Sequence, residues 1–121
     1  MTECVPFLKV KNVEQTMNWY KAIGFDCTGT NQVWEPGCEL NWARLEWDSA
    51  AFMIGPDERT VFPDTKDTGL WFNVDSVDSI VDILKRNYIK MDIETATFYC
   101  RKVVSFRDIN GFDVSFSCAL H

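Results

Sequence analysis

This sequence of 121 residues contains few of the residue patterns that enzymes use for catalysis or metal binding. Histidine, a common general base and metal ligand, occurs once, at His121. The five cysteines form no C-x-x-C pair, so the sequence predicts neither a zinc site nor a disulfide framework. They are Cys4, Cys27, Cys38, Cys100 and Cys118. Free thiols are typical of a reducing compartment, and we therefore expect a cytoplasmic protein.

Acid–base catalysis needs a titratable side chain held against the reacting group. Asp113, on a predicted strand near the end of the chain, is the best candidate, but a lone carboxylate more often anchors a ligand or stays solvated. A nucleophilic cysteine would need a partner base, and no such pair is recognisable in the sequence. Arg44, Arg101 and Lys102 are most simply exposed strand charges. We therefore predict no catalytic residue and no cofactor.

Aromatic residues make up 14% of the chain, including 5 tryptophans and 9 phenylalanines. Rings exposed in a cleft can stack on flat, apolar or cationic ligands, so the surplus indicates a small-molecule site. Two alternative roles stay open for each ring, because aromatic residues also fill hydrophobic cores and cover dimer interfaces.

The charge balance excludes some partners. Lysine and arginine number 12 against 18 aspartates and glutamates, a net charge of −6, whereas nucleic-acid binding usually needs a basic face. No apolar run approaches the roughly 20 residues that span a membrane, and the first residues lack the features of a signal peptide. We predict no nucleic-acid partner and no membrane partner. The acidic balance either serves solubility or favours cationic small molecules.

The predicted secondary structure repeats once along the chain, in the order strand, capped helix and further strands. Val5–Val10 is a predicted strand, and Asn12 is the predicted N-cap of an amphipathic helix. Later, Leu70–Val74 is a predicted strand and Ser76 a predicted N-cap, at the same spacing. Asn110–Gly111 favours a type I′ hairpin turn. The strands predicted after the helices are Phe25–Thr30, Trp42–Trp47, Ala51–Ile54, Asp92–Thr97, Tyr99–Phe106 and Asp113–Ser117.

Each half is therefore a βαβββ module, and we expect one domain made of both. Module one covers about residues 4–54 and module two about 69–118, with the polar residues 55–68 as a linker. Neither module is large enough to fold well alone. The modules should therefore pair within one chain or be exchanged between the two chains of a homodimer.

The two ends of the chain resemble the vicinal-oxygen-chelate superfamily, which contains glyoxalase I, the bleomycin-resistance proteins and the extradiol dioxygenases. Phe7–Tyr20 with Ile23–Phe25 resembles the opening of its first module. Tyr99–Phe112 resembles its closing stretch, with Ile109 in place of the usual proline. The resemblance covers nearly the whole chain. It implies an α+β fold in which two βαβββ modules form a curved mixed sheet around a cleft, often at a dimer interface.

The resemblance also implies where a divalent metal would be held in that cleft. The superfamily's ligands are a His or Glu on the first strand of each module and a Glu on the last. Counted along this sequence, the first-strand positions fall at Val5 and Gly69, and the last-strand positions fall at Met53 and Ser115. Such a set offers almost nothing to a hard divalent ion. We therefore predict no metal, as in the bleomycin-resistance type.

Strand alternation predicts which side chains line the cleft. Trp71 and Phe7 face it on the first strands, and Asp113 and Ser115 on the last. Trp42 and Trp47 are five positions apart and should face opposite sides, so which of them faces the cleft stays open. The predicted ligand-binding residues are Phe7, Trp42, Trp47, Trp71, Tyr99, Asp113 and Ser115.

Three functions compete at this point. The first is a metal-free small-molecule-binding protein like the bleomycin-resistance proteins, which holds an aromatic or cationic ligand and sequesters an antibiotic. The second is an enzyme of the superfamily, of the glyoxalase, lyase or dioxygenase kind, with atypical or absent metal ligands. The third is a regulatory or interaction module that uses the dimer cleft for a partner.

Overall fold

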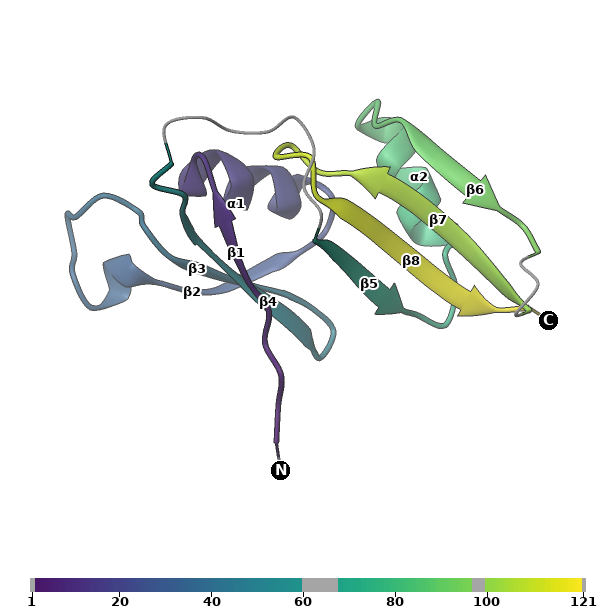
Figure 1. Cartoon of the computed structure of the whole chain (residues 1–121), viewed down its shortest axis with the longest axis horizontal. Helices are drawn as coiled ribbons and strands as arrows, with labels where there is room; N and C mark the ends of the chain where they lie inside the picture. Colours follow the sequence, from purple (N-terminus) through teal and green to yellow (C-terminus); the bar gives the residue numbers. More distant parts are fainter. Residues whose placement is uncertain (1, 60–67, 97–99, 121) are drawn as a thin grey trace. The chain divides into compact units, whose positions relative to one another are not determined.

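The computed structural model describes residues 2–59, 68–96 and 100–120, in two compact units that divide after Phe62 (Figure 1). The first unit has one mixed sheet in the order β1-β4-β3-β2, with β1 parallel to β4 and the other pairs antiparallel. Its elements are β1 (Phe7–Val10), α1 (Val13–Ala22), β2 (Asp26–Thr30), the 3-10 turn η1 (Asn31–Val33), β3 (Ala43–Trp47) and β4 (Ala50–Pro56).

The second unit repeats this plan. Its sheet has the order β5-β8-β7-β6, with β5 parallel to β8 and the remaining pairs antiparallel. Its elements are β5 (Gly69–Asn73), α2 (Asp78–Arg86), β6 (Met91–Glu94), β7 (Arg101–Arg107) and β8 (Asp113–Ala119). The predicted α+β class and the βαβββ order of each half are confirmed.

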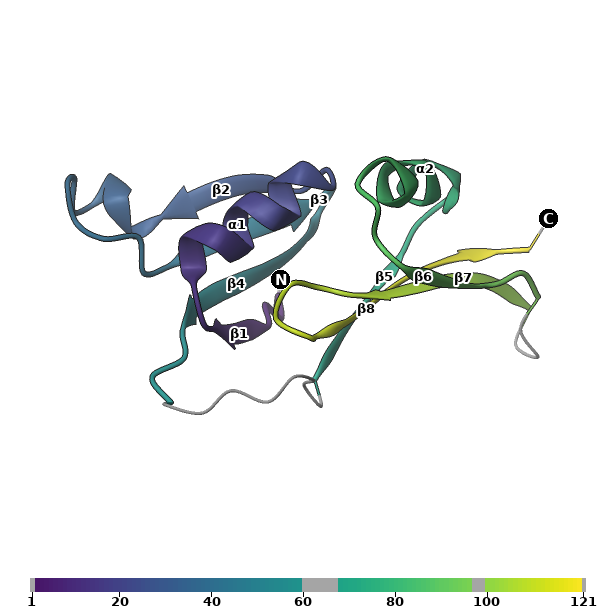
Figure 2. The ribbon, with the colours of Figure 1, turned by 90° about the horizontal axis from the view of Figure 1, so that it is seen from above.

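Each helix covers one face of its own sheet, as Figure 2 shows for α1 and α2. Under α1, the buried rings of Tyr20, Phe25 and Phe52 meet edge to face with centroids 5.0–5.7 Å apart. Under α2, Phe72 stacks on Phe116 at 5.0 Å. Most of the buried apolar side chains of the strands lie on these faces, and we call the opposite face of each sheet its open face.

Several element ends differ from the sequence prediction. The first strand begins at Phe7 and not at Val5, because Pro6 has no N–H to give to a ladder and its carbonyl accepts from the Met53 N–H at 2.8 Å. The Asn12 cap is confirmed, since its Oδ1 accepts from the Gln15 N–H at 2.8 Å. Helix α2 begins one residue later than expected, with Val77 at the N-cap position.

Ser76 nevertheless holds the start of α2, because its Oγ accepts from the Asp78 N–H at 3.2 Å. The β7–β8 hairpin is present, but its turn is not type I′. Asn110 does not have the positive φ which that turn requires, and only Gly111 does, at 88°. The Asp108 carboxylate closes the loop instead by accepting from the N–H groups of Asn110 and Phe112, at 2.8 and 3.0 Å.

No helix among the described residues is long and apolar enough to cross a membrane.

Phe52 and Phe7 lie on opposite faces of the first sheet and provide a test of this packing. Phe52 is 1% exposed and Phe7 is 50% exposed. We expect Phe52→Ala to lower the free energy of unfolding by about 3–5 kcal/mol, because it leaves a cavity under α1. Phe7→Ala should cost less than about 1 kcal/mol. Urea denaturation measures both, and equal losses would contradict the assignment of an open face.

Candidate ligand-binding faces

The open face of the second sheet carries a cross-strand row of polar and aromatic side chains. The register pairs Trp71 with Ser115, Ser115 with Ser105, and Ser105 with Asp92. Residues paired in register point to the same side of a sheet. Trp71 is 51% exposed while its strand neighbours Leu70 and Phe72 are buried against α2. The row therefore crosses all four strands of this unit on its solvent side.

The Trp71 indole is held in place by hydrogen bonds. Its Nε1–H donates to Asn73 Oδ1 at 2.9 Å, and the Arg101 guanidinium donates to the same oxygen at 3.3 Å. Arg101 also donates to the Ser117 hydroxyl and, at 3.2 Å, to the Ser117 carbonyl. The indole is thus bonded to Asn73, which is connected through Arg101 of β7 to Ser117 of β8.

The sequence interpretation of Arg101 as an exposed strand charge is wrong. The residue is half-buried, and Ser117, which accepts from it twice, is fully buried. Its role was not visible in the sequence because Ser117 and Asn73 come next to it only through the register of β5, β8 and β7. Arg101 and Asn73 therefore join the candidate site as residues that position Trp71.

A hollow of about 600 Å³ opens beside this row, and all of its lining belongs to the second unit. At its floor the hydroxyls of Ser105 and Ser115 are 2.9 Å apart and hydrogen-bonded. Asp113 lies on its rim, 3.5 Å from Arg107, and both side chains are more than half exposed. Asp113 is therefore a solvated carboxylate in an ion pair, which is not the environment of a positioned general base.

The open face of the first sheet carries two more of the predicted rings. The Phe7 ring lies over Gly55, where a Cβ would come within 2.7 Å of the ring's Cζ. The Trp42 ring lies over Gly29, where a Cβ would be 3.4 Å from the indole carbons. Both glycines therefore leave room for a ring to rest on the sheet.

Trp47 lies on the other side of the same sheet, which corrects its prediction as a ligand-binding residue. Its ring meets the buried Phe25 edge to face at 5.2 Å. Ala43 and Leu45 alternate with Arg44 along β3 and are buried on that side, and Trp47 continues their series. Of the pair that the sequence left open, Trp42 is the residue on the open face. Tyr99 lies outside the described residues.

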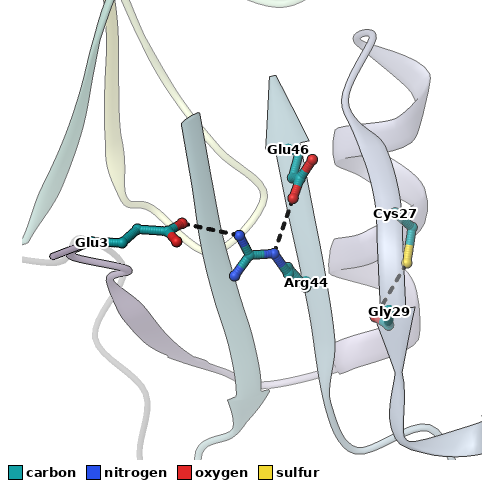
Figure 3. A network of polar contacts seen from close by, with 5 residues as sticks. All are labelled: Glu3, Cys27, Gly29, Arg44 and Glu46. Atoms are coloured by element: carbon teal, nitrogen blue, oxygen red, sulfur yellow. Dashed lines mark hydrogen bonds and ion pairs between the residues drawn. The ribbon is translucent and has the colours of Figure 1, made fainter. Parts of the chain in front are cut away.

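The first open face also holds Arg44 in ion pairs with two carboxylates (Figure 3). Arg44 Nε donates to Glu46 at 3.0 Å, and Arg44 Nη2 donates to Glu3 at 3.1 Å. The hydrogen bonds that Arg44 donates to Glu46 and to Glu3, with the one to Glu46 having the larger effect, raise the pKa of Arg44 above its ordinary value. Glu3 belongs to the segment before β1, so the ion pair ties that segment to β3. Figure 3 also shows Cys27, whose thiol donates to the Gly29 carbonyl at 3.6 Å.

The residues at the superfamily's metal positions do not fit a divalent ion. Val5 and Gly69 have no side-chain donor atom, and Met53 offers only a thioether. The Ser115 hydroxyl is a neutral group already bonded to Ser105. Within residues 2–59, 68–96 and 100–120, no group of three or more His, Cys, Asp or Glu side chains could hold a metal.

Comparison with known proteins agrees with this architecture. No family model matches the chain, and no curated protein matches it. Among solved structures, a bleomycin-binding protein in complex with bleomycin superposes with a TM-score of 0.76 at 11% identity, covering 98% of both chains. The chain has the vicinal-oxygen-chelate fold.

Two further structures have this fold and are named for other functions. A glyoxalase-family protein from Bacillus anthracis has a TM-score of 0.71 at 16% identity, over 98% of this chain and 97% of that one. The fosfomycin-resistance protein FosX from Listeria monocytogenes has a TM-score of 0.73 at 11% identity, over 98% and 93%. The resemblance seen in the sequence is thus confirmed for the fold, while the activity has to be argued from the faces themselves.

The indole of Trp71 provides a direct test of the hydrogen-bonded site. We expect Asn73→Ala to shift the Trp71 indole N–H resonance upfield and to speed its exchange with water, because the acceptor at 2.9 Å is removed. A proton–nitrogen correlation spectrum follows every indole N–H separately. The Trp34 resonance serves as the control, since that side chain is 83% exposed in a loop of the first unit. An unchanged Trp71 signal would contradict the bond.

Proposed function

We propose that this protein binds a small molecule that carries a flat aromatic or cationic group, and that it does so without a metal. The observation that carries the proposal is the Trp71 indole, half exposed on an open sheet face and oriented there by its hydrogen bond to Asn73, whose side-chain oxygen also accepts from Arg101. A ring that is already held in one plane loses little conformational freedom when a ligand stacks on it. Its exposed surface also gains burial on binding.

The first unit supports the same reading. Phe7 stands on β1 beside Met53 of β4, as Trp71 stands on β5 beside Ser115 of β8, and the two rings are 50% and 51% exposed. Each open face thus presents a ring next to a position where the superfamily would place a metal ligand. In this proposal, the two exposed rings provide a stacking surface at the place where other members of the superfamily bind a metal ion.

The net charge of −6 favours a ligand with a positive charge, because the summed field of an acidic protein attracts cations over long range. Sequestration of an antibiotic by a cytoplasmic homodimer is the most specific form of the proposal. It is supported by the shared fold with the bleomycin-binding protein and by the solvated, ion-paired state of Asp113. The alternative, an enzyme of the same superfamily, needs a metal or a catalytic group that the described residues of these faces do not offer.

The stacking role of Trp71 predicts a change in affinity. Titration with bleomycin and with a planar aromatic cation such as an acridinium dye should quench tryptophan fluorescence. Trp71→Ala should weaken binding of the quenching ligand about tenfold or more, because a stacked ring pair contributes roughly 0.5–1.5 kcal/mol beyond the area it buries. The matched control is Trp34→Ala, which removes an equally large and more exposed ring. Unchanged affinity in Trp71→Ala would remove that residue from the site.

The absence of a metal requirement is tested separately. Elemental analysis of the purified protein should find no stoichiometric Mn, Fe, Ni or Zn, and EDTA should change neither the thermal midpoint nor the ligand affinity. Bound ligand stabilises the native state by mass action, so the same thermal-shift assay reports both quantities. One equivalent of tightly held metal would favour the enzyme alternative instead.

A further inference from the structure

The hollow of the second unit has features that the stacking proposal does not use. Its volume of about 600 Å³ is within the ~300–1,000 Å³ typical of small-molecule pockets. It opens over β6, β7 and β8, and Ser115 belongs both to its floor and to the row that contains Trp71. Its lining consists of Ile89, Lys90, Met91, Asp92, Ser105, Phe106, Arg107, Asp113 and Ser115.

The floor of the hollow can both donate and accept hydrogen bonds. The Ser105 and Ser115 hydroxyls are bonded to each other at 2.9 Å. That bond uses the hydrogen of only one hydroxyl, so the pair still offers an O–H donor and several acceptor lone pairs to a ligand. A surface with both capacities is complementary to hydroxyl groups, which have both capacities as well. A carboxylate or phosphate would use only the donor, and an ammonium only the acceptors.

The charges around the hollow cancel. Lys90 and Arg107 are balanced by Asp92 and Asp113, and Arg107 is already in an ion pair with Asp113 at 3.5 Å. The acidic character of the whole chain is therefore not concentrated here. The local electrostatics favour an uncharged polar group over an ion of either sign.

The remaining wall is apolar. Ile89 and Met91 are half-buried side chains that line the hollow at the start of β6. A ligand group that fits must therefore present C–H surface to this wall and hydroxyl groups to the serines. A saturated ring with several hydroxyls has both, whereas a plain hydrocarbon would leave the serine hydroxyls without their solvent partners.

We infer that the hollow binds an uncharged, hydroxyl-bearing ring of the sugar type. The inference rests on the proposed function, because it assigns this ring to the same ligand whose flat group lies on Trp71. Neighbouring strands are about 4.8 Å apart. A flat group stacked on Trp71 and a sugar ring over Ser105 and Ser115 would therefore be close enough to be joined by a short covalent linkage. The ligand class is thus a glycosylated aromatic compound.

The test uses simple probes of the hollow alone. Methyl glycosides of common hexoses are titrated into isotope-labelled protein at millimolar concentration, and backbone shifts are followed by proton–nitrogen spectra. We expect shifts at Met91, Asp92, Ser105 and Ser115, and much smaller ones for cyclohexylmethanol, which keeps the saturated ring and the exocyclic hydroxyl but lacks the ring hydroxyls. The Ser105→Ala/Ser115→Ala variant should weaken glycoside binding about tenfold, since two hydrogen-bonding groups are lost. Ser79→Ala, an exposed serine on α2, is the matched control.

The outcomes separate this inference from the proposed function. Quenching of Trp71 by the aromatic cation, with no glycoside shifts at the hollow, would overturn the sugar subsite and leave the stacking proposal standing. Equal shifts with cyclohexylmethanol would also overturn it, because the ring hydroxyls would then contribute nothing. Glycoside shifts that disappear in the double serine variant and persist in Ser79→Ala would support it. Because these shifts are read in the wild-type chain, the test holds even if the double variant is destabilised.

Discussion

The constraint on which both units depend is that a helix can cover only one face of a sheet. Alternation along each strand then assigns its side chains to one face or the other. Leu8 and Val10 are buried under α1, so Phe7 has to point away from it. In the same way the burial of Leu70 and Phe72 under α2 turns Trp71 outward. The candidate binding surface is therefore a consequence of how the core is packed and needs no separate scaffold.

Small residues decide how the rings rest on the open faces. The Phe7 ring occupies the space that a Cβ on Gly55 would take, and Trp42 lies against Gly29. Gly69 has a related role in the second unit, where a Cβ would be 3.2 Å from the Asp113 carbonyl oxygen. A larger residue at Gly69 would crowd the first pair of the β5–β8 ladder. The glycines thus allow flat packing in one unit and close strand pairing in the other.

Sequence patterns were sufficient for the elements and for most faces, because helical and strand periodicity are local properties. They were insufficient wherever register decides the contact. The bonds Arg101–Ser117 and Ser105–Ser115 join residues on β7 and β8, whose alignment is set by the loop between them. The Asn-Gly pair indicated a hairpin, but the Asp108 carboxylate closes a longer loop than a type I′ turn. A one-residue slip between these strands would change which residues stand opposite each other and so would break both bonds.

The two units have the same topology but carry different side chains at equivalent positions of their open faces. On the first open face, Met53 stands between Phe7 and Arg44, and Arg44 is neutralised by Glu46 and Glu3. On the second, Ser115 stands between Trp71 and Ser105, and the hydroxyl pair carries no charge. The hydroxyl pair of the second face can both donate and accept, whereas the Arg44 guanidinium of the first face only donates and is paired with two carboxylates. The two faces thus share an exposed ring. They differ in the residue on the third strand of each sheet, Arg44 or Ser105, and this residue determines which ligand group each face can hold.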